Sequence, residues 1–281
     1  MYRLIWFQHV HKAAGSSIIN QAVANGEVLF PSHQNGNPCN EGGEVMPLWD
    51  FDEGELRGFV DECQTKEVTF VATEWGAPNF GTLHDDPRVL LMTCIREPWS
   101  RLVSNFNYDH YLGFSNSTTL AEYLVEDRRI MMDNLLVRIF ANRFLAERGS
   151  IGEDSLSNAL SNLSLFDLVI VIERDGDLSD HLFGALDWEK MKVDSHSTFG
   201  NRWTLSRLVR KFRLASAIRY ILKMKIEVSE DDHHLFEDQS RIDLEFYGRI
   251  MEGGIRGRLH PLNMNPENSS NRSGSIHLRD R

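Results

Sequence analysis

The chain has 281 residues, of which 41% are hydrophobic, and its formal net charge at pH 7 is −11. This length and apolar content suffice for one large α/β domain. The acidic balance opposes binding to nucleic acid or to an anionic membrane unless the protein has a local basic face, and no nucleic-acid partner is expected. The three cysteines, Cys39, Cys63 and Cys94, lack metal-ligand spacing, and the sequence begins with neither a signal-peptide pattern nor a long apolar run. We therefore expect reduced thiols in a cytoplasmic protein.

The first predicted element is a buried strand over residues 2–9, which runs into a turn of small residues and then a helix over 16–24. The turn contains Lys12, Ala13, Ala14, Gly15, Ser16 and Ser17. A strand that opens a helix through such a turn leaves backbone N–H groups pointing outward at the positive end of the helix dipole. Lys12 precedes Gly15, whereas the Walker motif places its lysine after the glycine. The turn is therefore a predicted anion site of another kind.

The remaining pattern alternates strands and helices. Further strands are predicted over 68–72, 88–95 and 166–172, and helices over 51–63, 97–112, 118–125, 131–147, 153–163 and 177–186. This alternation predicts an α/β fold with a mainly parallel central sheet flanked by helices. Ligands of such sheets bind at the carboxyl ends of the strands. The long stretch 25–50 is rich in Gly, Asn and Pro and is predicted to be an irregular loop.

A second anion-binding element follows the strand over 88–95. Arg96 stands at the strand end, Pro98 is suited to the first turn of a helix, and Ser104 lies two turns further along that helix. An arginine in this place is suited to a phosphate, although a surface ion pair is the alternative. Arg101 is expected either to support the phosphate site or to pair with Glu97, which is otherwise suited to capping the helix.

These two elements, in this order, resemble the sulfotransferase family that uses 3′-phosphoadenosine 5′-phosphosulfate (PAPS). The resemblance implies a P-loop-like sulfotransferase fold in which Lys12 to Ser17 bind the 5′-phosphosulfate and Arg96 and Ser104 bind the 3′-phosphate. Residues 134–138, with the sequence Asn-Leu-Leu-Val-Arg, resemble the carbohydrate 2-O/6-O (heparan sulfate type) members. The implied acceptor is thus a carbohydrate or a glycolipid, and no metal is implied. The family usually has proline where this chain has His11.

The general base is expected to be Glu74, which follows the second strand, and His11 is the substitute. In the resembling enzymes a histidine occupies the place of Glu74. We expect a raised pKa for this carboxyl, which lies beside an aromatic residue. The alternative is that Glu74 only orients Lys12 or Arg96. His9, His84 and His110 are weaker candidates, and the segment 231–234 is interpreted as a solvated helix start rather than a metal site.

Residues 202–225 contain eight basic residues and no acidic one, and apolar residues recur among them at helical spacing. We predict an amphipathic basic helix over 203–225, which either packs on the sheet or faces an anionic acceptor or lipid headgroups at the membrane periphery. Residues 194–198, with Asn201 and Arg202, lie in the region where the resembling family often closes a loop over the nucleotide, so the resemblance implies that role here. Residues 1–253 are expected to form the sulfotransferase domain and 254–281 a poorly ordered tail.

The sequence thus predicts a PAPS-dependent sulfotransferase. An ATP-dependent small-molecule kinase is one alternative, which the position of Lys12 disfavours. A noncatalytic nucleotide-binding or membrane-associated module is another, which the absence of a base would favour.

Overall fold

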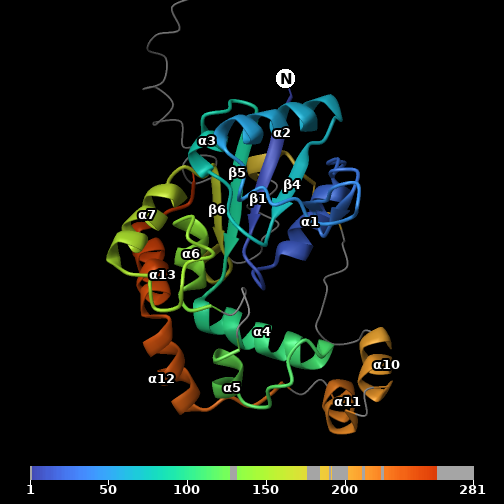
Figure 1. Ribbon diagram of the computed structural model, residues 1–281, viewed down its shortest axis with the longest axis vertical. Helices are drawn as coiled ribbons and strands as arrows, with labels where there is room; N and C mark the ends of the chain where they lie inside the picture. The colour runs from blue at the N-terminus through green and yellow to red at the C-terminus, as the bar shows by residue number, and fades with distance from the viewer. Residues whose placement is uncertain are drawn as a thin grey trace, which may run out of the picture.

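The central sheet has four strands, all parallel, in the order β4-β1-β5-β6 (Figure 1). The computed structural model describes residues 2–126, 132–175, 184–189, 191, 202–210, 213–222 and 225–257. The strands are β1 (Leu4–His9), β4 (Phe70–Thr73), β5 (Val89–Ile95) and β6 (Leu168–Val171). The predicted α/β class with a parallel sheet is therefore confirmed.

Helices cover both faces of this sheet, because successive residues of β1 point to opposite sides. Leu4 and Trp6 pack into one buried cluster, and Ile5 and Phe7 pack into another. The first cluster includes residues of α2 (Glu53–Thr65), α3 (Phe80–His84), α6 (Leu135–Phe140), α7 (Glu153–Leu163) and α13 (Arg241–Gly253). The second includes residues of α1 (Gly15–Ala24) and the 185–188 segment.

The carboxyl edge of the sheet is faced by α4 (Pro98–Leu112), whereas α2 lies at the opposite edge (Figure 1). Below α4 in that view lie α5 (Leu120–Leu124), α10 (Arg202–Arg210), α11 (Leu214–Ile221) and α12 (Glu230–Gln239). A one-turn helix, α8 (Ile172–Asp175), follows β6 directly. None of the helices in the described part of the chain has the length and apolar character needed to cross a membrane.

The helix predicted over 131–147 is shorter in the structure, where α6 ends at Phe140. Its N-cap residue, Asn134, has a left-handed φ of 51°. Asn142, two residues after the end of the helix, has a left-handed φ of 54°. Between them, the buried Arg138 guanidinium donates to the backbone oxygens of Asp133, Ala146 and Glu147. The chain therefore turns back around one arginine, a tertiary interaction that overrides the helical pattern.

The basic stretch is also different from the prediction, because α10 and α11 are two separate helices rather than one over 203–225. Arg213 between them has φ −86° and ψ 58°, outside the helical region. Its guanidinium donates to the His110 carbonyl at 2.9 Å, which ties this break to α4.

The stretch 25–50 contains a short hairpin, formed by β2 (His33–Gln34) and β3 (Asn37–Pro38), that the sequence did not predict. Gly36 in its turn has φ 81°, and a Cβ there would lie 3.0 Å from the Ala72 side chain. The hairpin thus lies against β4 and contributes Asn37 to the edge of the site.

The chain after α13 returns to the sheet and runs beside its outer strand, β6. The backbone oxygen of Arg256 accepts from Val169 N at 3.0 Å, so residues 254–257 lie along β6. Most of the predicted tail (258–281), most of the predicted 177–186 helix and the 194–198 segment lie outside the described residues.

Candidate functional site

The loop from β1 to α1 exposes the start of that helix. Lys12 and Ala14 have φ values of 66° and 59°, so the chain makes two left-handed steps before Gly15. Ala14 is the capping residue, and it supplies no side-chain hydrogen bond to this helix start. The N–H of Ser17 donates to the Ala14 oxygen at 3.0 Å. The start of α1 therefore presents the positive end of its dipole at the place where the sequence predicts an anion site.

Gly15 is required by the packing of this loop. A Cβ at position 15 would lie 1.8 Å from Nε2 of His9, which is 4% exposed and stacks on Phe7. Burial lowers the pKa of His9. The sequence analysis set His9 aside as a weak candidate, and the structure places it directly behind the loop.

Glu74 lies between two imidazoles at the end of β4. Its Oε1 is 2.6 Å from Nδ1 of His11, and its Oε2 is 3.5 Å from Nδ1 of His9. Burial works to raise the pKa of Glu74, but the nearby His9 and the hydrogen bond with His11 outweigh it. The pKa of this carboxyl is therefore lowered, contrary to the expected rise, because histidines at positions 9 and 11 fold back onto it. Asn37 Oδ1 accepts from the Glu74 backbone N–H at 2.8 Å and fixes the strand end.

The second ring nitrogen of His11 is not used by Glu74. Nε2 is buried and has no hydrogen-bond partner among the described residues. A carboxylate that holds one nitrogen of an imidazole fixes its tautomer and leaves the second nitrogen to accept a proton. This arrangement is compatible with His11 as a base that Glu74 orients, and the choice between the two candidates stays a prediction.

Lys12 lies over an aromatic ring at the same edge. Its Nζ is 4.0 Å from the centroid of the Tyr108 ring on α4. Burial lowers the pKa of Lys12 to about 8. The charge of Asp109 raises this pKa, and the charge of the neighbouring Arg96 lowers it. A partly desolvated ammonium of this kind gains more from a bound anion than an exposed lysine does.

Arg96 connects this loop to a pocket of about 230 Å³ along α4. Its Nη1 donates to the Lys12 carbonyl at 3.4 Å, and its Nε lies 3.9 Å from the Glu173 carboxylate, beyond hydrogen-bond reach. That Nε is buried and lacks a hydrogen-bond partner in the described part of the chain. The pocket is lined by Arg96, Trp99, Ser100, Val103, Ser104, Asn107, Lys225 and Val228.

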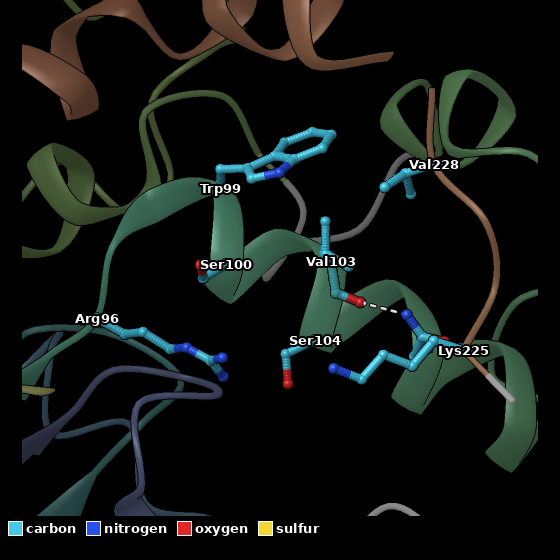
Figure 2. A pocket seen from close by; sticks show the side chains of 8 residues that line it. Arg96, Trp99, Ser100, Val103, Ser104, Lys225 and Val228 are labelled. Carbon is cyan, nitrogen blue, oxygen red and sulfur yellow. Dashed lines mark hydrogen bonds between the residues drawn. The ribbon is translucent and has the colours of Figure 1, made fainter. Parts of the chain in front are cut away.

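Three polar groups converge inside this pocket. In Figure 2 the Arg96 guanidinium and the Lys225 ammonium extend from opposite sides toward the Ser104 hydroxyl. The segment that carries Lys225 is fixed to α4, because Ile226 N donates to Asn107 Oδ1 at 2.8 Å. Two cations beside a hydroxyl form a suitable cradle for a phosphate.

The structure brings the two predicted anion sites to one edge of the sheet and joins them through Arg96. The sequence analysis missed Lys225, which it counted with the basic helix, and Tyr108. Tyr108 contacts Lys12 and Lys225 lines the pocket with Ser104, and in both cases the two residues are distant in the chain. The place of Lys225 at the end of a run of basic residues could have indicated an anion site.

Other predicted residues have structural surroundings. Glu97 caps α4, since its carboxylate accepts from Trp99 N at 2.9 Å and Ser100 N at 2.7 Å. Arg101 is 3% exposed and does not line the pocket; burial lowers its pKa, and the charge of Asp243 opposes this. The carboxylate of Asp243 accepts from the N–H groups of Leu136 and Val137 at the start of α6.

The 134–138 segment, which carried the subtype resemblance, is likewise a packing element. Asn134 Oδ1 accepts from the N–H groups of Ile242 and Asp243 at the start of α13, at 2.9 and 3.0 Å. The starts of α6 and α13 therefore cap one another through Asn134 and Asp243.

No protein-family model and no curated protein matches this chain. Within the described residues, no three or more His, Cys, Asp or Glu side chains are grouped so as to hold a metal ion.

Proposed function

We propose that this protein is a sulfotransferase, which moves the sulfuryl group of PAPS to a hydroxyl of a carbohydrate or glycolipid. The observation that carries the proposal is the pair of anion sites at one edge of the sheet, the Lys12 loop and the Arg96 pocket, which a direct contact connects. A ligand with anionic groups at two separated positions is the simplest match. PAPS has a 5′-phosphosulfate and a 3′-phosphate on one nucleoside. The choice of acceptor rests on the resemblance in sequence.

The donor would bind with its phosphosulfate at the start of α1 and its 3′-phosphate in the pocket. The first N–H groups of α1 and the Lys12 ammonium would hold the phosphosulfate. Arg96, Ser104 and Lys225 would hold the 3′-phosphate, each with a polar hydrogen directed into the same space. This extends the predicted pair of 3′-phosphate ligands by one lysine.

Transfer would proceed by a single in-line displacement. The acceptor oxygen forms a bond to sulfur while the bond from sulfur to the 5′-phosphate oxygen breaks, and adenosine 3′,5′-bisphosphate leaves. The acceptor proton passes to Nε2 of His11, and Glu74 stabilises the imidazolium through Nδ1. Lys12 offsets the charge that grows on the leaving oxygen, so catalysis rests on positioning and electrostatic stabilisation.

Calorimetry with adenosine 3′,5′-bisphosphate, AMP and ATP tests the donor assignment. The wild-type protein should bind the bisphosphate more tightly than either of the other nucleotides. Arg96→Ala removes a charge-assisted contact, so the bisphosphate should lose about 1.5–3 kcal/mol of binding free energy, while AMP, which lacks the 3′-phosphate, should lose little. The exposed Arg57 on α2, at the opposite edge of the sheet, supplies the control Arg57→Ala. Equal losses for the bisphosphate and AMP, or a preference for ATP, would overturn the proposal.

A further inference from the structure

One face of α11 is apolar and exposed. Leu214, Ile218 and Ile221 are 59%, 59% and 61% exposed, and Leu222 at the end of the helix is 62% exposed. These residues are separated by four, three and one positions, so they form one stripe along the helix. We call these four residues the α11 stripe. Large apolar side chains usually reach the surface singly, and a contiguous group of them indicates a contact surface.

The opposite face of α11 already has a partner within the fold. Ala217 and Tyr220 are each 4% exposed and pack with Leu208 of α10 and Tyr111 of α4. The ring centroids of Tyr111 and Tyr220 are 5.7 Å apart. Packing inside the protein therefore accounts for the second face of the helix, and within the described residues the α11 stripe remains exposed.

The sequence segment that contains the stripe has a charge opposite to that of the whole chain. Residues 202–225 contain eight Lys or Arg residues and no Asp or Glu, although the chain carries a net charge of −11. Two of these cations, Arg210 and Lys225, are exposed. Such a basic segment attracts an anionic surface and repels a second copy of itself.

We infer that α10 and α11 dock this protein on an anionic lipid bilayer, with the α11 stripe inserted at the level of the headgroups. A short apolar stripe flanked by Lys and Arg is the pattern of helices that lie in the membrane interface. Folded nucleic acid shares the charge but offers no apolar phase for the four side chains. A second copy offers the apolar surface but has the wrong charge.

Docking through this stripe would hold α4 near the membrane. Ser216 Oγ lies 3.2 Å from Nε2 of His110, and Arg213 also donates to the His110 carbonyl. Because Ser104 lies on α4 and Arg96 lies two residues before its first turn, α4 connects the pocket with the docking surface. The inference does not depend on which nucleotide the pocket takes.

Flotation of the full chain with vesicles tests the inference without any activity assay. The wild-type protein should float with vesicles of phosphatidylcholine that contain phosphatidylglycerol, should remain free with phosphatidylcholine alone, and should be released as salt is raised. Ile218→Glu should lower the partition coefficient by about tenfold, because it places a charge where an apolar side chain enters the bilayer.

Val125→Glu is the matched control, since Val125 is 71% exposed at the end of α5 and lies outside the stripe. Arg210→Glu, which leaves the stripe intact, should weaken binding to the anionic vesicles and so supports the inference through a second residue. Equal partition of the wild type, Ile218→Glu and Arg210→Glu into the anionic vesicles would overturn the inference. A wild-type dimer that Ile218→Glu dissociates, with no flotation, would also overturn it and would assign the stripe to a second copy.

Discussion

The pKa of Lys12 predicts that binding of adenosine 3′,5′-bisphosphate weakens as the pH rises from 7 to 9. Burial lowers this pKa to about 8. The charged ammonium binds an anion, so affinity is nearly full at pH 7 and falls as the pH rises through about 8. With this pKa, the protonated fraction falls from about 0.9 at pH 7 to about 0.1 at pH 9, and the apparent Kd rises about tenfold, or about 1.4 kcal/mol. The ligand's phosphates lose their second protons near pH 6, below this window.

Calorimetry at a series of pH values in buffers of different ionisation enthalpy measures both the affinity and the proton uptake. The wild-type protein should take up a proton on binding above pH 8, because the anion raises the pKa of Lys12. Lys12→Arg is the matched control, since a guanidinium stays charged over this range and should flatten the profile. A wild-type Kd that is constant from pH 7 to 9 would refute the placement of the ligand beside Lys12.

Three further predictions concern the proposed catalytic pair His11 and Glu74, the loop over 12–17 and the fold. His11→Asn should lower turnover by about 10²–10⁴, and Glu74→Gln by less, both with bisphosphate affinity nearly unchanged; the reverse order of the two losses would return the role of base to Glu74. Gly15→Ala should abolish bisphosphate binding, because the new Cβ would overlap the buried His9 at the end of β1. Gly58→Ala, in open space on α2, is the control and should leave binding intact. Normal bisphosphate binding by Gly15→Ala would contradict the loop geometry. Asn134→Ala should lower the free energy of unfolding by about 2–4 kcal/mol in urea titrations, because it leaves two buried N–H groups without an acceptor, and a loss below 1 kcal/mol would contradict the mutual capping of α6 and α13.

The parts of the fold that the sequence predicted are those fixed by local patterns. The strands β1 and β5 are continuous apolar runs, as expected for strands buried on both faces, and Pro98 sets the start of α4. The turn between β1 and α1 was predictable for the same reason, since a strand, small residues and a helix are adjacent in the chain. By contrast, the end of α6 depends on Arg138 and carbonyls up to nine residues away, and the periodicity of the sequence does not contain that contact.

The chemistry of the site was less predictable than its position. Glu74 was expected at the sheet edge with a raised pKa, but that expectation considered burial and not the two histidines that approach it from β1 and the loop. Lys225 was counted with a helix, because its role depends on how the chain returns to α4 more than a hundred residues after Ser104. Pairs that are distant in sequence therefore decide the pKa values and the composition of the pocket.

Transfer of labelled sulfur from PAPS is the most direct test of the proposed activity. The protein would be incubated with sulfur-labelled PAPS and a mixture of carbohydrate and glycolipid acceptors, beside Lys12→Ala, which removes the charge expected to stabilise the leaving group. The wild-type protein should place the label on an acceptor hydroxyl and release adenosine 3′,5′-bisphosphate in equal amount. The Lys12→Ala variant should lose turnover by a larger factor than it loses affinity for the bisphosphate. A wild-type protein that binds the bisphosphate but leaves the label on the nucleotide with every acceptor would contradict the assignment as a sulfotransferase.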